Sequence, residues 1–442
     1  MNSFVIALIL FAVTYVLLFT LPKYRAYVAL GSAVIFTVWL SLSTDIVYSP
    51  IDSLLGIDFN VLMMIAGTMG IVTLFIESKM PMLIADVLLS KFKSVKTAIV
   101  AMAALSGIVS AFVDNVATVL MIAPIALAVC KKQNMSPVFP IIAIAVSSNL
   151  QGAATLVGDT TSILLGGHLG MTFFDFFVFK GKPGIFWAVE LGAFLTVLIL
   201  LWIFRKETAS LTLSERTEVT DYVPSFLMGG VIVLLILASF LKAPAEGFWL
   251  TVYSHRNGLI CMTLLITGVL INLVRCKNFD SFKLVIKEMD YQTILLLASL
   301  FVVINGITAA GVIDRLANGL ASIGGSNLFL MYTIIVFASV AVSAFVDNIP
   351  YTLTMLPVVR GVALAMGNIE YEIVLCFGLL IGATLGGNIT PIGASANITG
   401  IGILRKEGYE VKAGDFMKIS VPFTLTAVLS GYLFIWLFWG IL

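Results

Sequence analysis

The hexapeptide Ser-Ala-Phe-Val-Asp-Asn occurs twice, at residues 110–115 and 343–348, and each copy lies within a long apolar stretch. An aspartate at the centre of a membrane helix costs about 2.5–3.5 kcal/mol on insertion scales. Asp114 and Asp347, with the neighbouring asparagines, could serve only as helix caps. Serine would cap equally well, so water access, a bound cation or a proton explains the carboxylates better. The duplication predicts a transporter.

A second pair of polar segments follows the two hexapeptides, at residues 152–162 and 387–397. Glycines in both segments permit unwinding, and both are flanked by apolar sequence long enough to complete a span. We predict broken helices whose hydroxyls, freed carbonyls and N-termini hold a small ion near the bilayer midplane. The carboxylate of Asp159 has no counterpart because Ala394 is the aligned residue. We therefore predict that Asp159 binds the coupling Na⁺ or H⁺, with turn stabilisation as the alternative.

The predicted binding site combines both pairs of segments. One half consists of Asp114, Asn115, Thr118, Thr155, Gly158, Asp159 and Thr160, and the other of Asp347, Asn348, Thr352, Asn388, Thr390, Ser395 and Asn397. Na⁺ is predicted at Asp114, Asn115, Asp159, Asp347 and Asn348. Unpaired ionised carboxylates in a dry site would be costly, which favours bound Na⁺ or H⁺. The solute is either an inorganic or organic anion carried with cations, or the cation itself exchanged for protons.

Composition sets the environment of these residues. Hydrophobic residues make up 60% of the 442 residues and charged residues only 11%, and the mean hydropathy is +1.09. This is too much apolar surface for a soluble core and predicts a polytopic protein in a lipid bilayer. We expect this bilayer to be a bacterial or archaeal plasma membrane. The net charge of +1 gives no support for nucleic-acid binding. The four cysteines have no CxxC spacing and are predicted to be structural.

The sequence contains eight apolar runs that are long enough to span a membrane. They lie near 4–21, 27–43, 60–77, 185–204, 223–241, 257–274, 290–309 and 417–441. Basic and acidic loops alternate between the first runs, which predicts both termini outside the cell. The arm 116–130 reaches only about 22 Å, short of the ~30 Å hydrocarbon core. This favours a re-entrant hairpin with a cytoplasmic base, whereas the matching stretch 328–366 should enter from outside.

The two halves repeat the same order of elements. We predict an all-α membrane protein with one inverted repeat at 1–205, a cytoplasmic linker at 206–221 and a second inverted repeat at 222–442. Each repeat contributes one re-entrant hairpin and one broken transmembrane helix. Two oppositely inserted copies of one fold have two related conformations of similar energy, which is the basis of alternating access. His168 and His255 are predicted to be ordinary interfacial residues, and residues 173–179 an interfacial helix.

These motifs resemble the ion transporter superfamily, specifically the ArsB/NhaD permeases and the P-protein group, and more remotely the divalent anion/sodium symporters. The similarity rests on Val-Asp-Asn-x-x-Thr at 113–118, Gly-x-x-Thr-x-x-Gly-Asp at 152–159 and the glycine- and asparagine-rich element at 386–397. Gly158-Asp159-Thr160-Thr161 is more similar to the NhaD sodium/proton antiporters. The resemblance implies a scaffold with a moving transport domain, an elevator-type motion and a homodimer.

Three other classes were weighed. A Na⁺/H⁺ antiporter of the NhaD type is the closest alternative to an anion transporter. An ion channel would also explain carboxylates lining water. Two intramembrane aspartates could form a protease dyad, but the Gly-x-Gly-Asp signature is absent, since Leu156-Val157-Gly158 precedes Asp159. We therefore predict no enzymatic activity and no cofactor other than the coupling ion.

Overall fold

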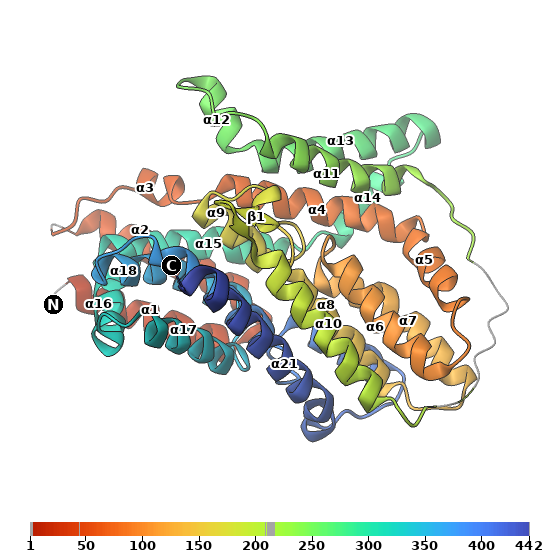
Figure 1. Ribbon diagram of the computed structural model, residues 1–442. Coiled ribbons are helices and arrows are strands. Elements are labelled where there is room, and N and C mark those ends of the chain that lie inside the picture. The colour runs from red at the N-terminus through yellow and green to blue at the C-terminus, as the bar shows by residue number, and fades with distance from the viewer. Residues whose placement is uncertain (1–2, 44, 208, 210–216, 442) are drawn as a thin grey trace.

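The computed structural model is almost entirely helical and describes residues 3–43, 45–207, 209 and 217–441 (Figure 1). The first half contains α1 (Ser3–Thr20), η1 (Pro22–Tyr24), α2 (Arg25–Leu42), α3 (Pro50–Leu55), α4 (Phe59–Glu77), α5 (Met80–Leu89), α6 (Val95–Ser110), α7 (Asn115–Lys132), α8 (Val138–Gly152), α9 (Thr160–Leu169), η2 (Phe174–Phe176), β1 (Val178–Phe179), β2 (Lys182–Pro183) and α10 (Ile185–Ile203). The second half contains α11 (Val223–Ser239), α12 (Phe248–Ser254), α13 (Arg256–Cys276), α14 (Asp280–Glu288), α15 (Tyr291–Ala309), α16 (Val312–Gly324), α17 (Leu328–Ser343), α18 (Asn348–Ala365), α19 (Tyr371–Gly386), α20 (Ser395–Lys406), α21 (Ala413–Ile435) and the π-helix η3 (Trp436–Gly440).

The predicted all-helical, polytopic class is confirmed. Among the described residues, eight helices are long and apolar enough to cross a membrane. The predicted run 223–241 forms the shorter α11, of 17 residues. The returning arm of the first hairpin is longer than predicted, because α7 extends over 18 residues to Lys132 and is itself of spanning length. The lysines in its last turn interact favourably with the helix dipole.

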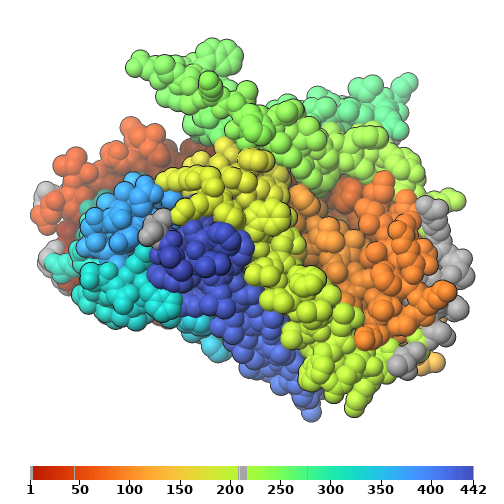
Figure 2. Space-filling view, viewed as in Figure 1, coloured from red at the N-terminus to blue at the C-terminus, as the bar shows by residue number. Residues whose placement is uncertain are grey.

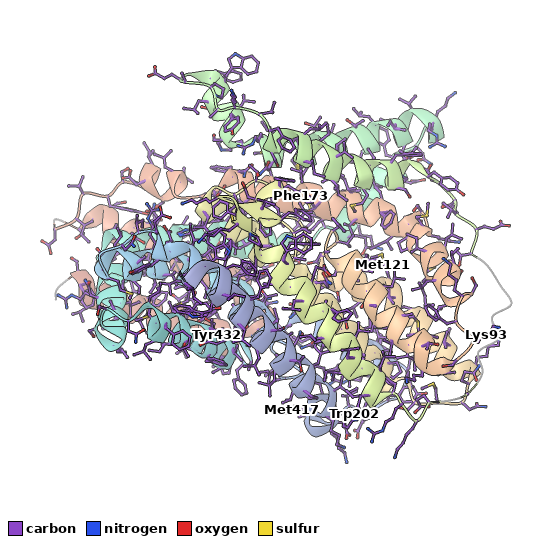
Figure 3. All side chains as sticks on the ribbon, viewed as in Figure 1. Lys93, Met121, Phe173, Trp202, Met417 and Tyr432 are labelled. Carbon is purple, nitrogen blue, oxygen red and sulfur yellow. The ribbon has the colours of Figure 1, made fainter. Side chains whose placement is uncertain are left out.

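Apolar side chains on α10 show how the helices meet lipid. Leu191, Phe194 and Leu198 recur every three to four residues and are exposed. α10 packs against α21, and the two lie side by side on the face toward the viewer in Figure 2. Trp202 near the end of α10 and Met417 near the start of α21 lie at the same end of the molecule (Figure 3). Such an exposed apolar stripe is stable only where hydrocarbon covers it.

The order of elements recurs between the halves. From α4 to α10, each helix has a counterpart among α15 to α21. Asp58 caps α4 and Asp290 caps α15, and each carboxylate accepts from the backbone N–H three residues later (3.0 Å in both cases). α7 and α18 each contain an internal proline, Pro124 and Pro357. The division at residues 205 and 222, and the opposite insertion of the halves, remain predictions.

The helices form two packed groups. In one, α4 packs on α13 and α2 on α15, with α11 along α13 in an outer layer that Figure 1 shows above α4. In the other, α6 packs on α8, α17 on α19 and α10 on α21. The groups meet where α4 contacts α9 and where α15 contacts α18. The loops that carry the polar motifs therefore lie near the boundary between the groups.

Two segments need separate mention. Residues 173–179 are not an interfacial helix: a 3₁₀ turn runs into β1, which pairs antiparallel with β2, and Phe173 and Phe176 are buried. The physical reason is that these rings pack into the protein core and not into the membrane interface. Of the predicted linker 206–221, residues 208 and 210–216 lie outside the described residues. Thr217 hydrogen-bonds to Asp86 of α5, and Thr220 to the Ser78 carbonyl.

Candidate functional site

Both hairpin tips are capped by their aspartates. Asp114 Oδ1 accepts from the backbone N–H groups of Val116 (3.0 Å) and Ala117 (3.2 Å). Asp347 Oδ1 accepts from the N–H of Ile349 (3.1 Å). The capping role considered from the sequence is therefore present at both sites. It uses one oxygen of each carboxylate in these contacts, so capping does not exhaust what the two groups can bind.

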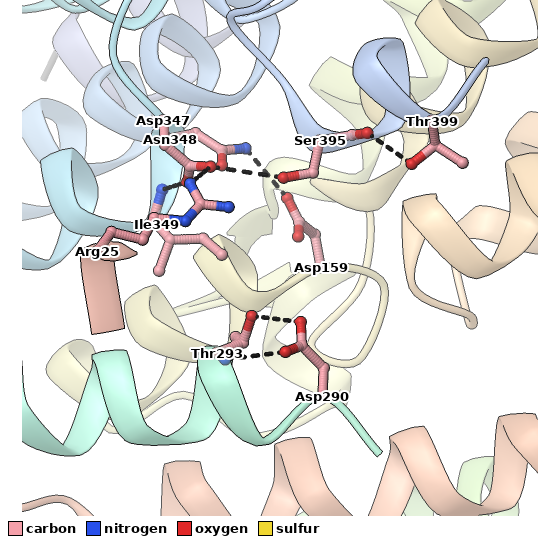
Figure 4. A network of polar contacts seen from close by, with 9 residues as sticks. All are labelled: Arg25, Asp159, Asp290, Thr293, Asp347, Asn348, Ile349, Ser395 and Thr399. Atoms are coloured by element: carbon pink, nitrogen blue, oxygen red, sulfur yellow. Dashed lines mark hydrogen bonds and ion pairs between the residues drawn. The ribbon is translucent and has the colours of Figure 1, made fainter. Parts of the chain in front are cut away.

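Asp347 is also paired with a cation that the sequence analysis missed. Arg25 Nη1 at the start of α2 lies 2.6 Å from Asp347 Oδ2, and Ser395 Oγ donates to the same oxygen at 3.4 Å (Figure 4). The Arg25 side chain is 32% exposed and that of Asp347 15%. Arg25 thus connects the first group of helices to the second hairpin tip. Because it neutralises Asp347, it disfavours the predicted Na⁺ contact at that carboxylate in this arrangement.

The two broken helices are fixed to the hairpin tips by the same bond. The Thr155 hydroxyl, between α8 and α9, donates to the carbonyl of Ala111. The Thr390 hydroxyl, between α19 and α20, donates to the carbonyl of Ala344. Each bond satisfies a carbonyl near the tip of the neighbouring hairpin, which would be costly to bury unpaired. These predicted site residues therefore hold the loops in place.

Gly158 and Gly393 are required by close backbone contacts. A Cβ on Gly158 would lie 2.7 Å from Gly152 O and 2.9 Å from Ala111 O. A Cβ on Gly393 would meet Gly387 O at 2.6 Å and Ala344 O at 2.7 Å. The obstructing atoms belong to the backbone and cannot rotate away. The two loops thus have the same packing requirement.

Gly158→Ala is therefore expected to destabilise the protein by about 1–3 kcal/mol, as overpacking does. Gly402→Ala is the matched control, because a Cβ there in α20 would meet nothing within 4 Å. That substitution should be neutral or stabilising by up to about 1 kcal/mol, since alanine favours helices. Thermal unfolding of the purified variants measures both. Equal unfolding temperatures for the two variants would contradict the packing argument.

Asp159 is the most enclosed carboxylate of the site. It is 4% exposed, and it caps α9 through Oδ1, which accepts from the N–H of Thr160 at 2.7 Å. Oδ2 accepts from the Thr161 hydroxyl at 3.0 Å and from the Asn348 amide at 3.4 Å. The last contact joins the broken helix of one half to the hairpin tip of the other. Ala394 occupies the equivalent cap position of α20 and supplies no carboxylate.

A chain of buried amides joins the halves. The Asn115 amide donates to Asn149 Oδ1 (2.8 Å), and the Asn149 amide donates to Asn388 Oδ1 (3.1 Å) and to the Thr384 carbonyl (2.7 Å). The Asn388 amide donates in turn to the Val146 carbonyl (3.0 Å). The sequence analysis missed Asn149, although the polar Ser147-Ser148-Asn149 run inside an apolar helix was a usable signal. Asn115 and Asn388 therefore stabilise the seam between the halves.

A cavity of about 590 Å³ lies between the helix groups. Six predicted residues line it: Asp114, Asn115, Asp159, Thr160, Asn348 and Ser395. Its acidic lining comprises Glu77, Asp114, Asp159, Glu288 and Asp290, of which Glu77, Glu288 and Asp290 were not predicted. Among the described residues, Arg25 is the single basic side chain that lines it. Asp290 lies across from Asp347, Arg25 and Ser395 (Figure 4). It caps α15 by accepting from the backbone N–H of Thr293.

The remaining predicted residues lie away from this lining. Thr118 donates to the Val113 carbonyl (3.5 Å), and the Asn397 amide donates to the carbonyls of Gly387 (3.0 Å) and Thr390 (3.1 Å). Thr352 is fully buried. Thr118 and Asn397 support the fold of the hairpin and the loop, and none of the three side chains lines the cavity.

A narrow recess adjoins the cavity and shares part of its lining. It holds about 20 Å³ and is lined by Asp114, Gly158, Asp159, Thr160 and Thr68 of α4, with apolar residues around them. A volume of about 10–15 Å³ suffices for one water molecule. The recess therefore has room for a single small species between residues that include two aspartates and two threonines.

Comparison with known proteins agrees with this architecture. The profile of the family described as citrate transporter (CitMHS) matches residues 8–375. An uncharacterized transporter of Mycobacterium tuberculosis is 29% identical over 441 residues, which is 98% of both chains. A 46 kDa membrane protein of Mycobacterium leprae is 28% identical over 438 residues, again 98% of both. The P protein of Homo sapiens is 25% identical over 443 residues, covering 85% of this chain and 53% of that protein.

Solved structures show the same fold. The YdaH transporter of Alcanivorax borkumensis aligns with a TM-score of 0.61 at 14% identity, covering 99% of this chain and 98% of that one. MtrF of Neisseria gonorrhoeae aligns with a TM-score of 0.57 at 12% identity, covering 96% and 86%. The family profile and the similarity to the P protein confirm the resemblance to the ion transporter superfamily. Because its profile spans most of the sequence, the chain belongs to the citrate transporter (CitMHS) family and is a secondary membrane transporter.

Proposed function

We propose that the protein is a Na⁺- or H⁺-coupled transporter that moves a small anion across the bacterial or archaeal plasma membrane by alternating access. One observation carries this proposal: the first residues of α7, α9, α18 and α20 all line the same cavity. Each helix N-terminus carries roughly half a positive charge, and the caps by Asp114, Asp159 and Asp347 use only one or two of the N–H groups in each first turn. Four of them around one space favour a bound anion.

Arg25 adds a full positive charge to the same cavity and already contacts a carboxylate, that of Asp347. A carboxylate or oxyanion solute would use the same guanidinium geometry. The name of the family, citrate transporter, supports a carboxylate as the solute. Metalloid and other inorganic oxyanions share this chemistry and belong in the same screen.

The coupling cation is proposed at the narrow recess. Five acidic side chains line the main cavity, so a multiply charged anion would be repelled unless cations entered with it. Asp114 and Asp159, with the Thr160 hydroxyl, offer oxygen ligands around a space for one small ion. Na⁺ binding there, or protonation of one carboxylate, would offset this repulsion. The Asn348 amide orients the carboxylate of Asp159, and the Asn115 amide orients Asn149.

The motion is proposed to be of the elevator type within a homodimer, with both termini outside the cell. The group containing both hairpins and both broken helices would form the transport domain, and the group built on α4 and α15 the scaffold. Support comes from the packing of the helices: α6 packs on α8 and α17 on α19 in one group, and α4 packs on α13 and α15 on α2 in the other. Rigid-body movement of one bundle against the other is the usual form of alternating access.

A Na⁺/H⁺ antiporter is the second candidate, because the cavity lining holds five acidic residues and one basic residue. Flux in proteoliposomes with imposed Na⁺ and pH gradients distinguishes the two. We expect gradient-dependent, saturable uptake of an anion from a screen of citrate, dicarboxylates, sulfate, phosphate and arsenite. Na⁺ movement without any anion would favour the antiporter. Single-channel current steps would contradict both carriers.

A further inference from the structure

Three side chains of mixed chemistry meet at the far end of α9 from the cavity. His168 Nε2 lies 2.9 Å from Glu372 Oε1, and the donor atoms of His168, Glu372 and Cys376 all lie within 4.8 Å of one another. Within the part of the chain that the structure describes, no other group of three His, Cys, Asp or Glu residues meets this spacing. From the sequence, His168 is predicted to be interfacial and Cys376 structural, so the cluster is not predicted.

Local structure explains why these residues converge. Glu372 and Cys376 are four residues apart on α19 and therefore lie on one face of that helix. α9 packs against α19 and presents His168 in its last turn. Eight residues separate His168 from Thr160, so the cluster lies about 12 Å along the helix from the cavity. It is thus a separate feature, and it joins one helix from each half.

We propose that His168, Glu372 and Cys376 form a transition-metal site that takes Zn²⁺. Imidazole nitrogen, carboxylate oxygen and thiolate sulfur are the three ligand types that Zn²⁺ binds, whereas Mg²⁺ and Ca²⁺ take oxygen ligands alone. Binding releases the thiol proton of Cys376 to water. The dipositive ion with one thiolate and one carboxylate then gives a neutral group. A water molecule completes the tetrahedral coordination.

The surroundings permit access. A cavity of about 170 Å³ is lined by His168 and Glu372 together with Arg360 of α18. Arg360 Nη1 lies 3.9 Å from Glu372 Oε1, but its side chain is 56% exposed and can turn into water when a metal binds. The nearby ion pair of Lys180 and Glu370 is exposed on both sides (3.2 Å). The buried Cys376 thiol forms the inner end of the site.

Cobalt tests the site directly, because Co²⁺ occupies zinc sites and its bond to a thiolate gives a near-ultraviolet charge-transfer band. The purified full-length protein titrated with Co²⁺ should develop this band, saturating at one equivalent per chain, and Zn²⁺ should displace it. Cys376→Ser should lose the band, and His168→Ala should lose saturable binding. Cys130→Ser and His255→Ala are matched controls, since these residues lie outside the cluster, and both should keep the band.

If Cys376→Ser fails to fold, His168→Ala still tests the site. His168 is only partly buried, and its loss leaves the α19 core intact. A band that persists in Cys376→Ser would overturn the proposal. So would the absence of saturable Co²⁺ and Zn²⁺ binding in the wild-type chain, or unchanged affinity in a folded His168→Ala variant. None of these outcomes depends on which solute the cavity carries.

Discussion

Asp159→Asn is expected to abolish cation-coupled uptake while leaving the fold intact. Asparagine keeps an oxygen that can accept from the N–H of Thr160, so the cap of α9 survives. It removes the charge from the recess shared with Asp114, and a cation there would lose one of two carboxylates. Uptake in proteoliposomes, measured with and without Na⁺ and pH gradients, checks the result. Gradients should no longer drive uptake.

Asp280→Asn is the matched control, because Asp280 is an exposed acidic residue in the first turn of α14. That variant should transport as the wild type does. If Asp159→Asn also kept wild-type uptake and wild-type cation dependence, Asp159 would have no part in coupling. An unfolded Asp159→Asn protein, recognised by size-exclusion chromatography, would instead assign the residue a structural role.

Arg25→Gln is expected to reduce transport by about tenfold or more, since it removes the basic group that lines the cavity and leaves Asp347 unpaired. A lost hydrogen bond to a charged group costs about 1.5–3 kcal/mol. The unfolding temperature of the single variant should fall accordingly. Arg25→Gln combined with Asp347→Asn removes both charges, so the double variant should recover stability. Transport should stay low in the double variant if Arg25 binds the solute.

Lys131→Gln serves as the control for this pair, because the ion pair of Lys131 and Glu407 is exposed. Exposed pairs contribute about 0–1 kcal/mol, so this variant should lose little stability and no transport. Full recovery of uptake in the double variant would show that Arg25 acts on Asp347 alone. Unchanged stability in Arg25→Gln would mean that the pair contributes nothing to the fold.

The hairpins and broken helices could be predicted because membrane insertion makes polar residues expensive, so each one in an apolar run is informative. Repetition strengthened this signal, and the equivalent bonds of Thr155 and Thr390 show that the alignment of the two loops was correct. Helix type and order followed from local composition alone. A polar residue in an apolar run does not reveal whether its side chain lines the cavity or stabilises a loop, as those of Thr155 and Thr390 do.

Local sequence patterns could not predict contacts between segments that are far apart in the sequence. Arg25 and Asp347 are 322 residues apart, and nothing in the sequence near either residue predicts that they meet. Residues 173–179 were misassigned because an aromatic run looks alike in a protein core and at a membrane interface. Gly181 in the sequence was a usable turn signal. In the structure Lys180 and Gly181 both adopt positive φ, as a two-residue hairpin turn requires.

The hydrogen-bonded side-chain amides of Asn115, Asn149 and Asn388 limit where neighbouring helices can separate. Pulling these helices apart would strand buried donors and acceptors at about 1–3 kcal/mol apiece. These hydrogen bonds therefore hold α7, α8 and the loop after α19 together. In the elevator motion proposed above, movement would therefore take place at the boundary with α4 and α15, where α9 and α18 make their contacts.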